Sequence, residues 1–328
     1  MRVAVTGSSG LIGAALVKEL ERRGHEVTRV VRSRGALSAR PGGPAAGGTT
    51  AAKPDASSGA GTGTGRAVVW DPVEGRIDAA GLEDHDAVVH LAAENVAGFW
   101  TSGKKRRIRE SRIRGTRLLA ETIAALDRPP SVFLSASAVG YYGDHPPAER
   151  VDEAQGPGTG FLAGVATEWE AASAAAAAAG IRTVQLRFGV VLSADGGMLA
   201  ALLPLFRLGL GGRLGRGEQM LSWIAHADAI GAILHLLTAS DLAGPVNVVA
   251  PQPVSNAVFT RALGQALRRP TPFAVPAFIL RALAGEMAEE MLLGGVGAVP
   301  KRLGADGFEF RLPTLDAALR AELRCARD

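Results

Sequence analysis

The chain has 328 residues, of which 47% are hydrophobic and 21% charged, and its formal net charge is only +4. This composition is typical of a globular protein with one large core, or a core and a smaller lobe, and the slight basic excess does not indicate a nucleic-acid partner. A single cysteine, Cys325, excludes an internal disulfide framework, and neither a signal peptide nor a membrane span is predicted, so we expect a cytoplasmic protein.

The N-terminal stretch predicts the start of a β-α-β unit. A β-branched run at residues 3–6 ends in a G-x-x-G-x-x-G turn, apolar residues then recur at helical spacing, and residues 26–31 are predicted to form a second strand. Such glycines allow a tight turn, a close approach to a pyrophosphate and close helix packing, while the helix N-terminus attracts the phosphate. The predicted cofactor contacts here are Thr6, Gly7, Ser9, Gly10, Leu11, Ile12 and Gly13.

The end of the second strand predicts the choice of cofactor. NAD-selective sites usually place a carboxylate at this position, whereas this chain has Arg32, followed by Ser33 and Arg34. Because arginine is a bidentate partner for a phosphate, we predict that Arg32 binds the 2′-phosphate and that NADP(H) is preferred over NAD(H). The alternative is a solvated loop arginine.

Residues 35–65 differ in composition from the rest of the chain. They are rich in Gly, Ala, Ser, Thr and Pro and contain almost no large apolar side chain. Such a segment cannot bury enough surface to offset the entropy lost on ordering. We therefore expect a disordered insertion after the second strand.

The third and fourth predicted strands bring further candidate residues to the cofactor. Residues 67–70 lead to Asp71, which either faces the adenine amino group or serves as a strand-end turn residue. Residues 87–93 form the fourth strand, and Glu94 follows in the crevice where open α/β sheets bind ligands. Small residues at this strand end would let a ribose lie against the backbone, and the predicted contacts are Leu91, Ala92 and Ala93.

The pattern of strands and helices continues to the C-terminus. A basic helix from about residue 104 is interpreted as a solvated face, because no aromatic residues interleave with its charges. Strands follow at residues 132–137, 183–192 and 245–249, and a mainly helical pattern follows Pro251. We predict an α/β fold with a Rossmann-type doubly wound parallel sheet at 1–249 and a small, mostly helical C-terminal domain at 250–328 on the substrate side.

Several stretches together resemble one family. They are residues 6–13, Ser-Ala-Ser-Ala-Val-Gly-Tyr-Tyr-Gly at 135–143, Ser-Trp-Ile at 222–224 and Gly-Glu-Met-Ala-Glu at 285–289. They are similar to atypical short-chain dehydrogenases/reductases of the sugar-nucleotide-epimerase-like family, also labelled cell-division inhibitors. The likeness covers nearly the whole chain except residues 35–65. That family often continues Ser-Trp-Ile with histidine, whereas this chain has Ala225, so no histidine role is carried over.

The resemblance also implies a proton relay that this chain lacks. The superfamily uses a tyrosine as acid/base, and a lysine four residues later holds the ribose and lowers the tyrosine pKa. Leu162 and Ala166 stand at the two matching positions, and Arg112 stands where a supporting asparagine is usual. Of the standard residues only the serine on the fifth strand, Ser137, is present.

Two classes of function therefore remain open. The first is an NADP-dependent oxidoreductase or nucleotide-sugar-epimerase-like enzyme in which Ser137 positions the substrate and Tyr142 or Glu94 moves the proton. The second is a catalytically weak NADP(H)-binding sensor, regulator or partner-binding protein. We favour the enzyme, because the C-terminal lobe suggests a substrate cleft that would include Tyr141, Arg213 and Trp223.

The remaining expectations concern contacts and partners. Ser135 and Gly189 complete the predicted cofactor contacts, and no metal site is predicted. The substrate is an unidentified small molecule, neither nucleic acid nor a membrane is expected as a partner, and the chain is expected to be a monomer or a homodimer.

Overall fold

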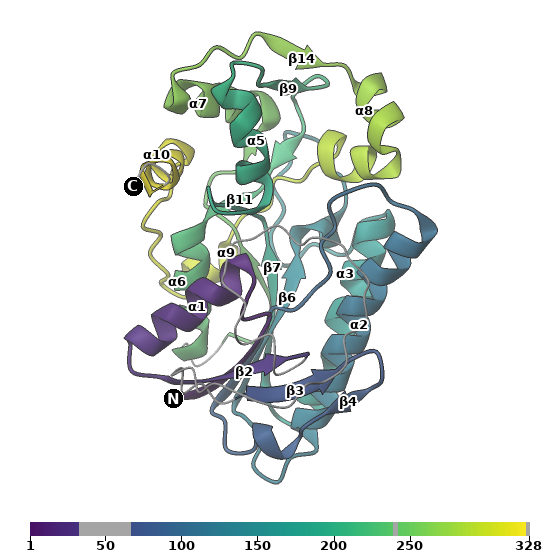
Figure 1. The fold of residues 1–328 in the computed structure, drawn as a ribbon, viewed down its shortest axis with the longest axis vertical. Coiled ribbons are helices and arrows are strands. Elements are labelled where there is room, and N and C mark those ends of the chain that lie inside the picture. Colours follow the sequence, from purple (N-terminus) through teal and green to yellow (C-terminus); the bar gives the residue numbers. More distant parts are fainter. Residues whose placement is uncertain (33–66, 239–241, 326–328) are drawn as a thin grey trace, which may run out of the picture.

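A sheet of eight strands forms the centre of the structure (Figure 1). The computed structural model describes residues 1–32, 67–238 and 242–325. Seven strands are parallel, in the order β12 (Gly244–Val248), β7 (Arg182–Phe188), β6 (Val132–Ala138), β5 (Ala87–His90), β1 (Arg2–Thr6), β2 (Glu26–Val31) and β3 (Ala67–Asp71). A short edge strand, β4 (Arg76–Ile77), pairs antiparallel with β3. The chain changes direction across the sheet between β1 and β5, which confirms the predicted doubly wound Rossmann-type fold.

Helices cover both faces of the sheet (Figure 1). One face carries α1 (Leu11–Arg22) and α6 (His226–Thr238), and the other carries α2 (Ser102–Ala124), α3 (Phe161–Ala171) and α4 (Ala174–Ala178). Strand side chains alternate between the two layers: Val3 and Val5 belong to the core under α1 and α6, whereas Ala4 belongs to the core under α2. Because both faces of each central strand are buried, these strands appear in the sequence as continuous apolar runs.

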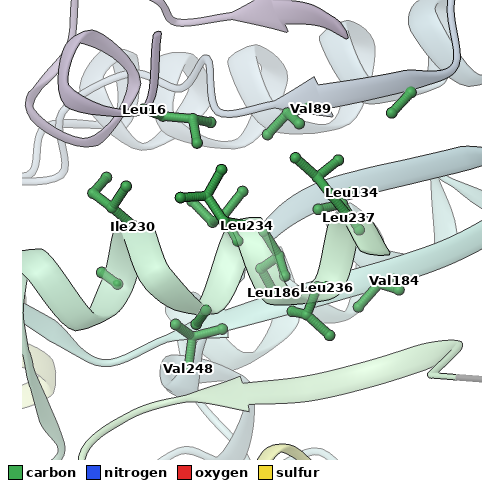
Figure 2. Close-up of a cluster of buried hydrophobic side chains, with 14 of the residues drawn as sticks. Leu16, Val89, Leu134, Val184, Leu186, Ile230, Leu234, Leu236, Leu237 and Val248 are labelled. Atoms are coloured by element: carbon green, nitrogen blue, oxygen red, sulfur yellow. The ribbon is translucent and has the colours of Figure 1, made fainter. Parts of the chain in front are cut away.

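The larger core lies between the sheet, α1 and α6 (Figure 2). Leu16 of α1, Leu186 of β7 and Val248 of β12 are completely buried in it. Burying one such side chain stabilises the fold by about 1.5–3 kcal/mol relative to leaving it exposed. The helix α6 contributes a stripe at helical spacing, made of Ile230, Ile233, Leu234 and Leu237. This packing holds the carboxyl ends of the parallel strands together at one edge of the sheet.

A second lobe lies beyond one end of the sheet (Figure 1). Its core is formed by β8 (Val190–Leu192), α5 (Gly197–Arg207), β11 (Trp223–Ala225), α7 (Asn256–Leu267) and α10 (Leu315–Cys325). The lobe therefore combines segments from both sides of residue 249 and is larger than the predicted unit at 250–328. The domain boundary itself stays a prediction, and the expected insertion at 35–65 lies outside the described residues.

Short elements complete the structure. Three strand pairs join β8 with β11, β9 (Gly212–Leu214) with β14 (Phe273–Val275), and β10 (Met220–Leu221) with β13 (Val254–Ser255). The other helical segments are η2 (Ala80–Leu82), η3 (Val139–Tyr142), α8 (Ala277–Ala284), the π-helical η4 (Ala288–Leu293) and α9 (Lys301–Ala305). No helix within the described ranges is long and apolar enough to cross a membrane.

Candidate functional site

The glycine loop between β1 and α1 is closely packed on both sides. Gly7 has a φ of +65°, and a Cβ added to it would lie 2.8 Å from the carbonyl carbon of Leu91. A Cβ added to Gly13 would lie 2.1 Å from the Gly7 oxygen, whereas one on Gly10 would lie 3.3 Å from that oxygen. Only glycine therefore fits at Gly7 and Gly13, the first because of the turn and the second because of the helix contact.

The N-terminus of α1 presents its backbone N–H groups to this crevice. Thr101 caps α2 and Ser255 caps α7 with a side-chain oxygen, but at Gly10 no side chain of the described residues caps α1. The first-turn N–H groups, including those of Leu11 and Ile12, therefore remain for a ligand. Together with the helix dipole they form an environment that favours an anion.

Thr6 joins the end of β1 to the end of β5. Its Oγ1 accepts the N–H groups of Leu91 at 3.0 Å and Ala92 at 3.2 Å and lies 2.7 Å from Nδ1 of His90. Because both lone pairs of Thr6 are used, its hydroxyl proton goes to Nδ1, which assigns the imidazole proton to Nε2. The Thr6 side chain thus positions residues 91 and 92, and the cofactor contact predicted for Thr6 stays a prediction.

His90 of β5 is a packed histidine. It is completely buried, and burial lowers its pKa to about 4, so the ring is neutral at pH 7. Its Nε2 has no hydrogen-bond partner among the described residues, and the ring meets Trp70 edge to face with 5.7 Å between centroids. An N–H group next to an aromatic ring is a weak but real interaction.

Arg32 and Asp71 stand at the ends of β2 and β3. Both line a pocket of about 840 Å³ that also touches β4 and α2. The Arg32 side chain is exposed and has no hydrogen bond or ion pair within the described ranges, whereas Asp71 accepts the N–H groups of Val73 at 3.0 Å and Glu74 at 3.1 Å. Asp71 therefore stabilises the turn after β3 through Oδ1, and its contact with the adenine amino group stays a prediction. Ser33 and Arg34 lie outside the described residues.

The loop after β5 is held by α2. Ser111 Oγ accepts the Glu94 N–H at 3.1 Å, and Arg112 donates to the Glu94 carbonyl at 3.0 Å. The Glu94 carboxylate accepts a bond from Lys104 at 2.9 Å, and this bond lowers its pKa despite the opposing effect of burial. Glu94 is thus ionised at neutral pH, where it has no proton to donate and is a weak base.

A buried polar chain crosses the sheet below the crevice. Ser137 donates to Glu170 at 2.7 Å, and Glu170 accepts two bonds of 2.8 Å from Arg187. Arg187 donates to the Tyr142 hydroxyl at 2.9 Å, which in turn donates to Asn247 at 2.7 Å. The chain links β6, α3, β7, η3 and β12, and every member has a defined partner.

This arrangement corrects the roles predicted for Tyr142 and Ser137. Tyr142 is completely buried, and burial raises its pKa even though the bond from Arg187 opposes that change. Ser137 is 3% exposed, and its hydroxyl proton is directed to Glu170. Neither side chain suits direct contact with a substrate, because both are enclosed and already hydrogen-bonded. Their role here is to connect the strands.

Tyr141 differs from its neighbour. It is half-buried, its ring centroid lies 3.6 Å from the Arg187 guanidinium carbon, and its hydroxyl has no hydrogen bond to the described residues. Burial would lower the pKa of Arg187, but the bonds to Glu170 and Tyr142 outweigh it and raise that pKa. A permanent cation is thus stacked on the Tyr141 ring. Of the two tyrosines, only Tyr141 retains a hydroxyl for a ligand.

The first turn of α3 is capped from the C-terminal part of the chain. The Glu290 carboxylate accepts the N–H groups of Phe161 at 2.6 Å and Leu162 at 2.8 Å. Nearby, Lys105 of α2 pairs with Glu286 at 2.7 Å. Sequence reasoning missed Glu290. The only available signal was that it directly follows the Gly-Glu-Met-Ala-Glu segment at 285–289, which resembles the family.

The remaining candidates occupy different places. Ser135 is buried in β6, and a Cβ added to Gly189 would lie 2.5 Å from the Ser222 oxygen, so this glycine serves backbone packing. Arg213 is exposed in the second lobe and donates to the Arg216 carbonyl at 3.0 Å. Trp223 is completely buried in the second core, with its Nε1 donating to Gln252 at 2.9 Å. The substrate contact predicted for Trp223 is therefore wrong.

Comparison with known proteins identifies the family. The model of the NAD dependent epimerase/dehydratase family matches residues 3–249, and a domain of unknown function, DUF1731, matches residues 275–322. The chain therefore belongs to the NAD-dependent epimerase/dehydratase family, which confirms the resemblance noted in the sequence. Epimerase family protein Mb2239 of Mycobacterium bovis is 41% identical over 319 residues, which cover 97% of this chain and 96% of that protein.

Two solved structures are similar over almost the whole chain. The crystal structure of human epimerase family protein SDR39U1 (isoform 2) with NADPH aligns with a TM-score of 0.81 and 33% identity, covering 99% of both chains. A nucleoside-diphosphate sugar epimerase of Corynebacterium glutamicum aligns with a TM-score of 0.74 and 33% identity, covering 98% of this chain and 58% of that one.

Proposed function

We propose that this protein binds NADP(H) across the carboxyl ends of β1, β2 and β5 and acts as an oxidoreductase or epimerase-like enzyme on a small molecule. The observation that carries the proposal is the glycine loop, where only glycine fits at Gly7 and Gly13 and α1 begins without a side-chain cap. This cradle suits a pyrophosphate. The NADPH in the human relative's structure supports the same choice.

The preference for NADP(H) rests on Arg32. An exposed guanidinium without a hydrogen bond or ion pair to the described residues, at the end of the strand next to β1, is suited to a 2′-phosphate. Arg32→Ala should weaken NADPH binding by about 1–3 kcal/mol, the range for a hydrogen bond to a charged group, and leave NADH binding nearly unchanged. Fluorescence titration with both cofactors tests this, with the exposed Arg216→Ala as a matched control. An equal loss for NADPH and NADH would refute the assignment.

The chemistry would combine the cofactor's nicotinamide, which supplies hydride transfer, with a proton donor from this chain. Tyr141 has an uncommitted hydroxyl, whereas Tyr142 and Ser137 are enclosed and Glu94 is held ionised by Lys104. We assign the proton transfer to Tyr141, with the cation of Arg187 behind its ring. Turnover should be slow, because no lysine stands beside this tyrosine to activate it.

A screen for NADPH oxidation with carbonyl compounds and nucleotide sugars tests the enzyme assignment. Tyr141→Phe should reduce kcat by at least about 100-fold, the usual contribution of a general acid, while Glu94→Gln should have a smaller effect. Tyr142→Phe serves as the comparison, because it removes a buried hydroxyl of the same kind. If Tyr141→Phe matches wild type in a screen where wild type turns over, this assignment fails.

The alternative function is binding of NADP(H) without turnover, as a sensor or partner-binding protein. The observation that favours it is α3, where Leu162 and Ala166 can do neither acid/base work nor ribose binding. Tight NADPH binding with no turnover of any tested compound would support this alternative. The cytoplasmic location, the small-molecule partner and the monomeric or homodimeric state stay predictions.

A further inference from the structure

Arg112 is a cation that the proposed chemistry leaves unused. It is a half-buried residue of α2, and one of its terminal nitrogens donates to the carbonyls of Glu94 and Ile108, both at 3.0 Å. Its guanidinium carbon lies 4.9 Å from the centroid of the Trp169 ring, and Trp169 is itself fixed by a bond of 2.8 Å to Thr116. The guanidinium is therefore held in one orientation at the exit of β5.

The other guanidinium nitrogens of Arg112 are not committed. Neither Nε nor the second terminal nitrogen has a hydrogen-bond partner among the described residues. Burial lowers the pKa of Arg112 to about 10, which still leaves it charged at neutral pH. An oriented cation with unused donors beside a crevice is suited to an oxygen-rich ligand group.

The order of the strands indicates which part of a dinucleotide would meet Arg112. Arg32 ends β2, the glycine loop follows β1, and Glu94 follows β5, and these three strands are neighbours in the order β2-β1-β5. A cofactor with its 2′-phosphate at Arg32 and its pyrophosphate at the loop would place its nicotinamide half beyond β1, at β5 and β6. Arg112 donates a hydrogen bond to the carbonyl of Glu94, the residue that follows β5, and therefore lies on that same side.

We infer that Arg112 donates hydrogen bonds to the nicotinamide-side ribose and that its positive charge makes the site favour reduced over oxidised cofactor. The inference rests on the proposed binding of NADP(H). The oxidised nicotinamide ring carries a positive charge that the reduced ring lacks, so a fixed cation near it penalises only the oxidised form. Ala166 of α3 carries no side-chain donor, whereas Arg112 supplies unused donors from α2.

Titration of the full chain with NADPH, NADP+ and 2′,5′-ADP tests this inference. Wild type should bind NADPH at least about tenfold more tightly than NADP+, the size expected for two unit charges about 10 Å apart near a protein surface. Arg112→Gln should weaken the binding of both dinucleotides and make their dissociation constants more nearly equal. Arg112→Lys should keep most of the preference, because it keeps the charge. Binding of 2′,5′-ADP, which lacks the nicotinamide half, should be the same in all variants.

Ser111→Ala is the matched control, because Ser111 holds the same loop through the Glu94 N–H without any charge. It should retain the preference for NADPH. The inference is overturned if Arg112→Gln keeps the NADPH preference, if Ser111→Ala abolishes it, or if Arg112→Gln weakens 2′,5′-ADP as strongly as NADPH. If wild type binds neither dinucleotide, the proposed function itself fails, and this outcome is distinct from a failure of the Arg112 variants alone.

Discussion

The hydroxyl of Thr6 and the ring of His90 connect β1 and β5 directly below the crevice. Thr6 accepts hydrogen bonds from the N–H groups of residues 91 and 92 and donates one to His90. These bonds place the backbone of residues 91 and 92 against Gly7. His90 must be neutral to accept the Thr6 proton, and burial provides for this by lowering its pKa to about 4. At this scale, hydrogen bonds between buried polar side chains position the backbone around the glycine loop.

The buried His90 predicts a dependence of stability on pH. Its folded pKa of about 4 lies below the ordinary histidine pKa of 6.5, so the unfolded chain binds the proton first and stability falls as pH drops through this window. Between pH 7 and pH 5 this histidine alone should lower the free energy of unfolding by about 2 kcal/mol. Urea denaturation at both pH values measures the loss, and His90→Leu should flatten it. An unchanged slope in His90→Leu, compared with the partly exposed control His145→Gln, would contradict the assignment.

At the scale of elements, helix α3 depends on a carboxylate that is remote in sequence. Its N-cap is Gly160, which offers no side chain, and Glu290 of η4 supplies the missing acceptor to two N–H groups. Glu290 thereby attaches η4 to the start of α3. The cap also brings negative charge to the positive end of the helix dipole.

Removing the Glu290 carboxylate should destabilise the fold measurably. Glu290→Ala should lower the free energy of unfolding by about 1–2 kcal/mol, as for the loss of a helix cap. Glu286→Ala is the control, because it removes a neighbouring carboxylate that only pairs with Lys105 near the surface, and should cost less than about 1 kcal/mol. Chemical denaturation of both variants decides the matter, and equal losses would show that Glu290 does not act as a cap.

At the scale of the whole molecule, the buried chain from Ser137 to Asn247 connects three strands of the sheet with α3 and η3. Asn247 of β12 also donates to the Val299 carbonyl at 2.9 Å, and its N–H bonds to Glu153 at 3.0 Å. The charged pair in the middle, Glu170 and Arg187, has side chains that are 13% and 3% exposed. Removing one partner of a pair buried to this degree destabilises a protein far more than removing both.

Single substitutions in this pair should therefore be severe. Arg187→Met should destabilise the protein by about 3–5 kcal/mol, because it leaves the Glu170 carboxylate buried without its cation. The double variant with Glu170→Met should recover part of that loss, since it removes both charges. Thermal and urea unfolding of the two single variants and the double variant form a cycle that measures the coupling. Additive losses in this cycle would mean that the two side chains act independently.

The sequence by itself determined the fold class and the place of the nucleotide loop. Both rest on patterns that are local in sequence. These are the strand, glycine and helix pattern at residues 3–20 and the apolar runs of the parallel strands, and each can be recognised without knowledge of distant segments. The structure then separated Gly7 and Gly13 as the positions where a side chain would clash.

Only the tertiary structure decided which polar groups face the crevice. Tyr141 and Tyr142 are neighbours in sequence, yet one keeps an unpartnered hydroxyl and the other is enclosed between Arg187 and Asn247. Trp223 belongs to the second core, and Glu290 reaches α3 across 129 positions of the chain. Burial and hydrogen-bond partners depend on contacts between segments that are distant in sequence. The spacing of residues along the chain does not reveal these contacts.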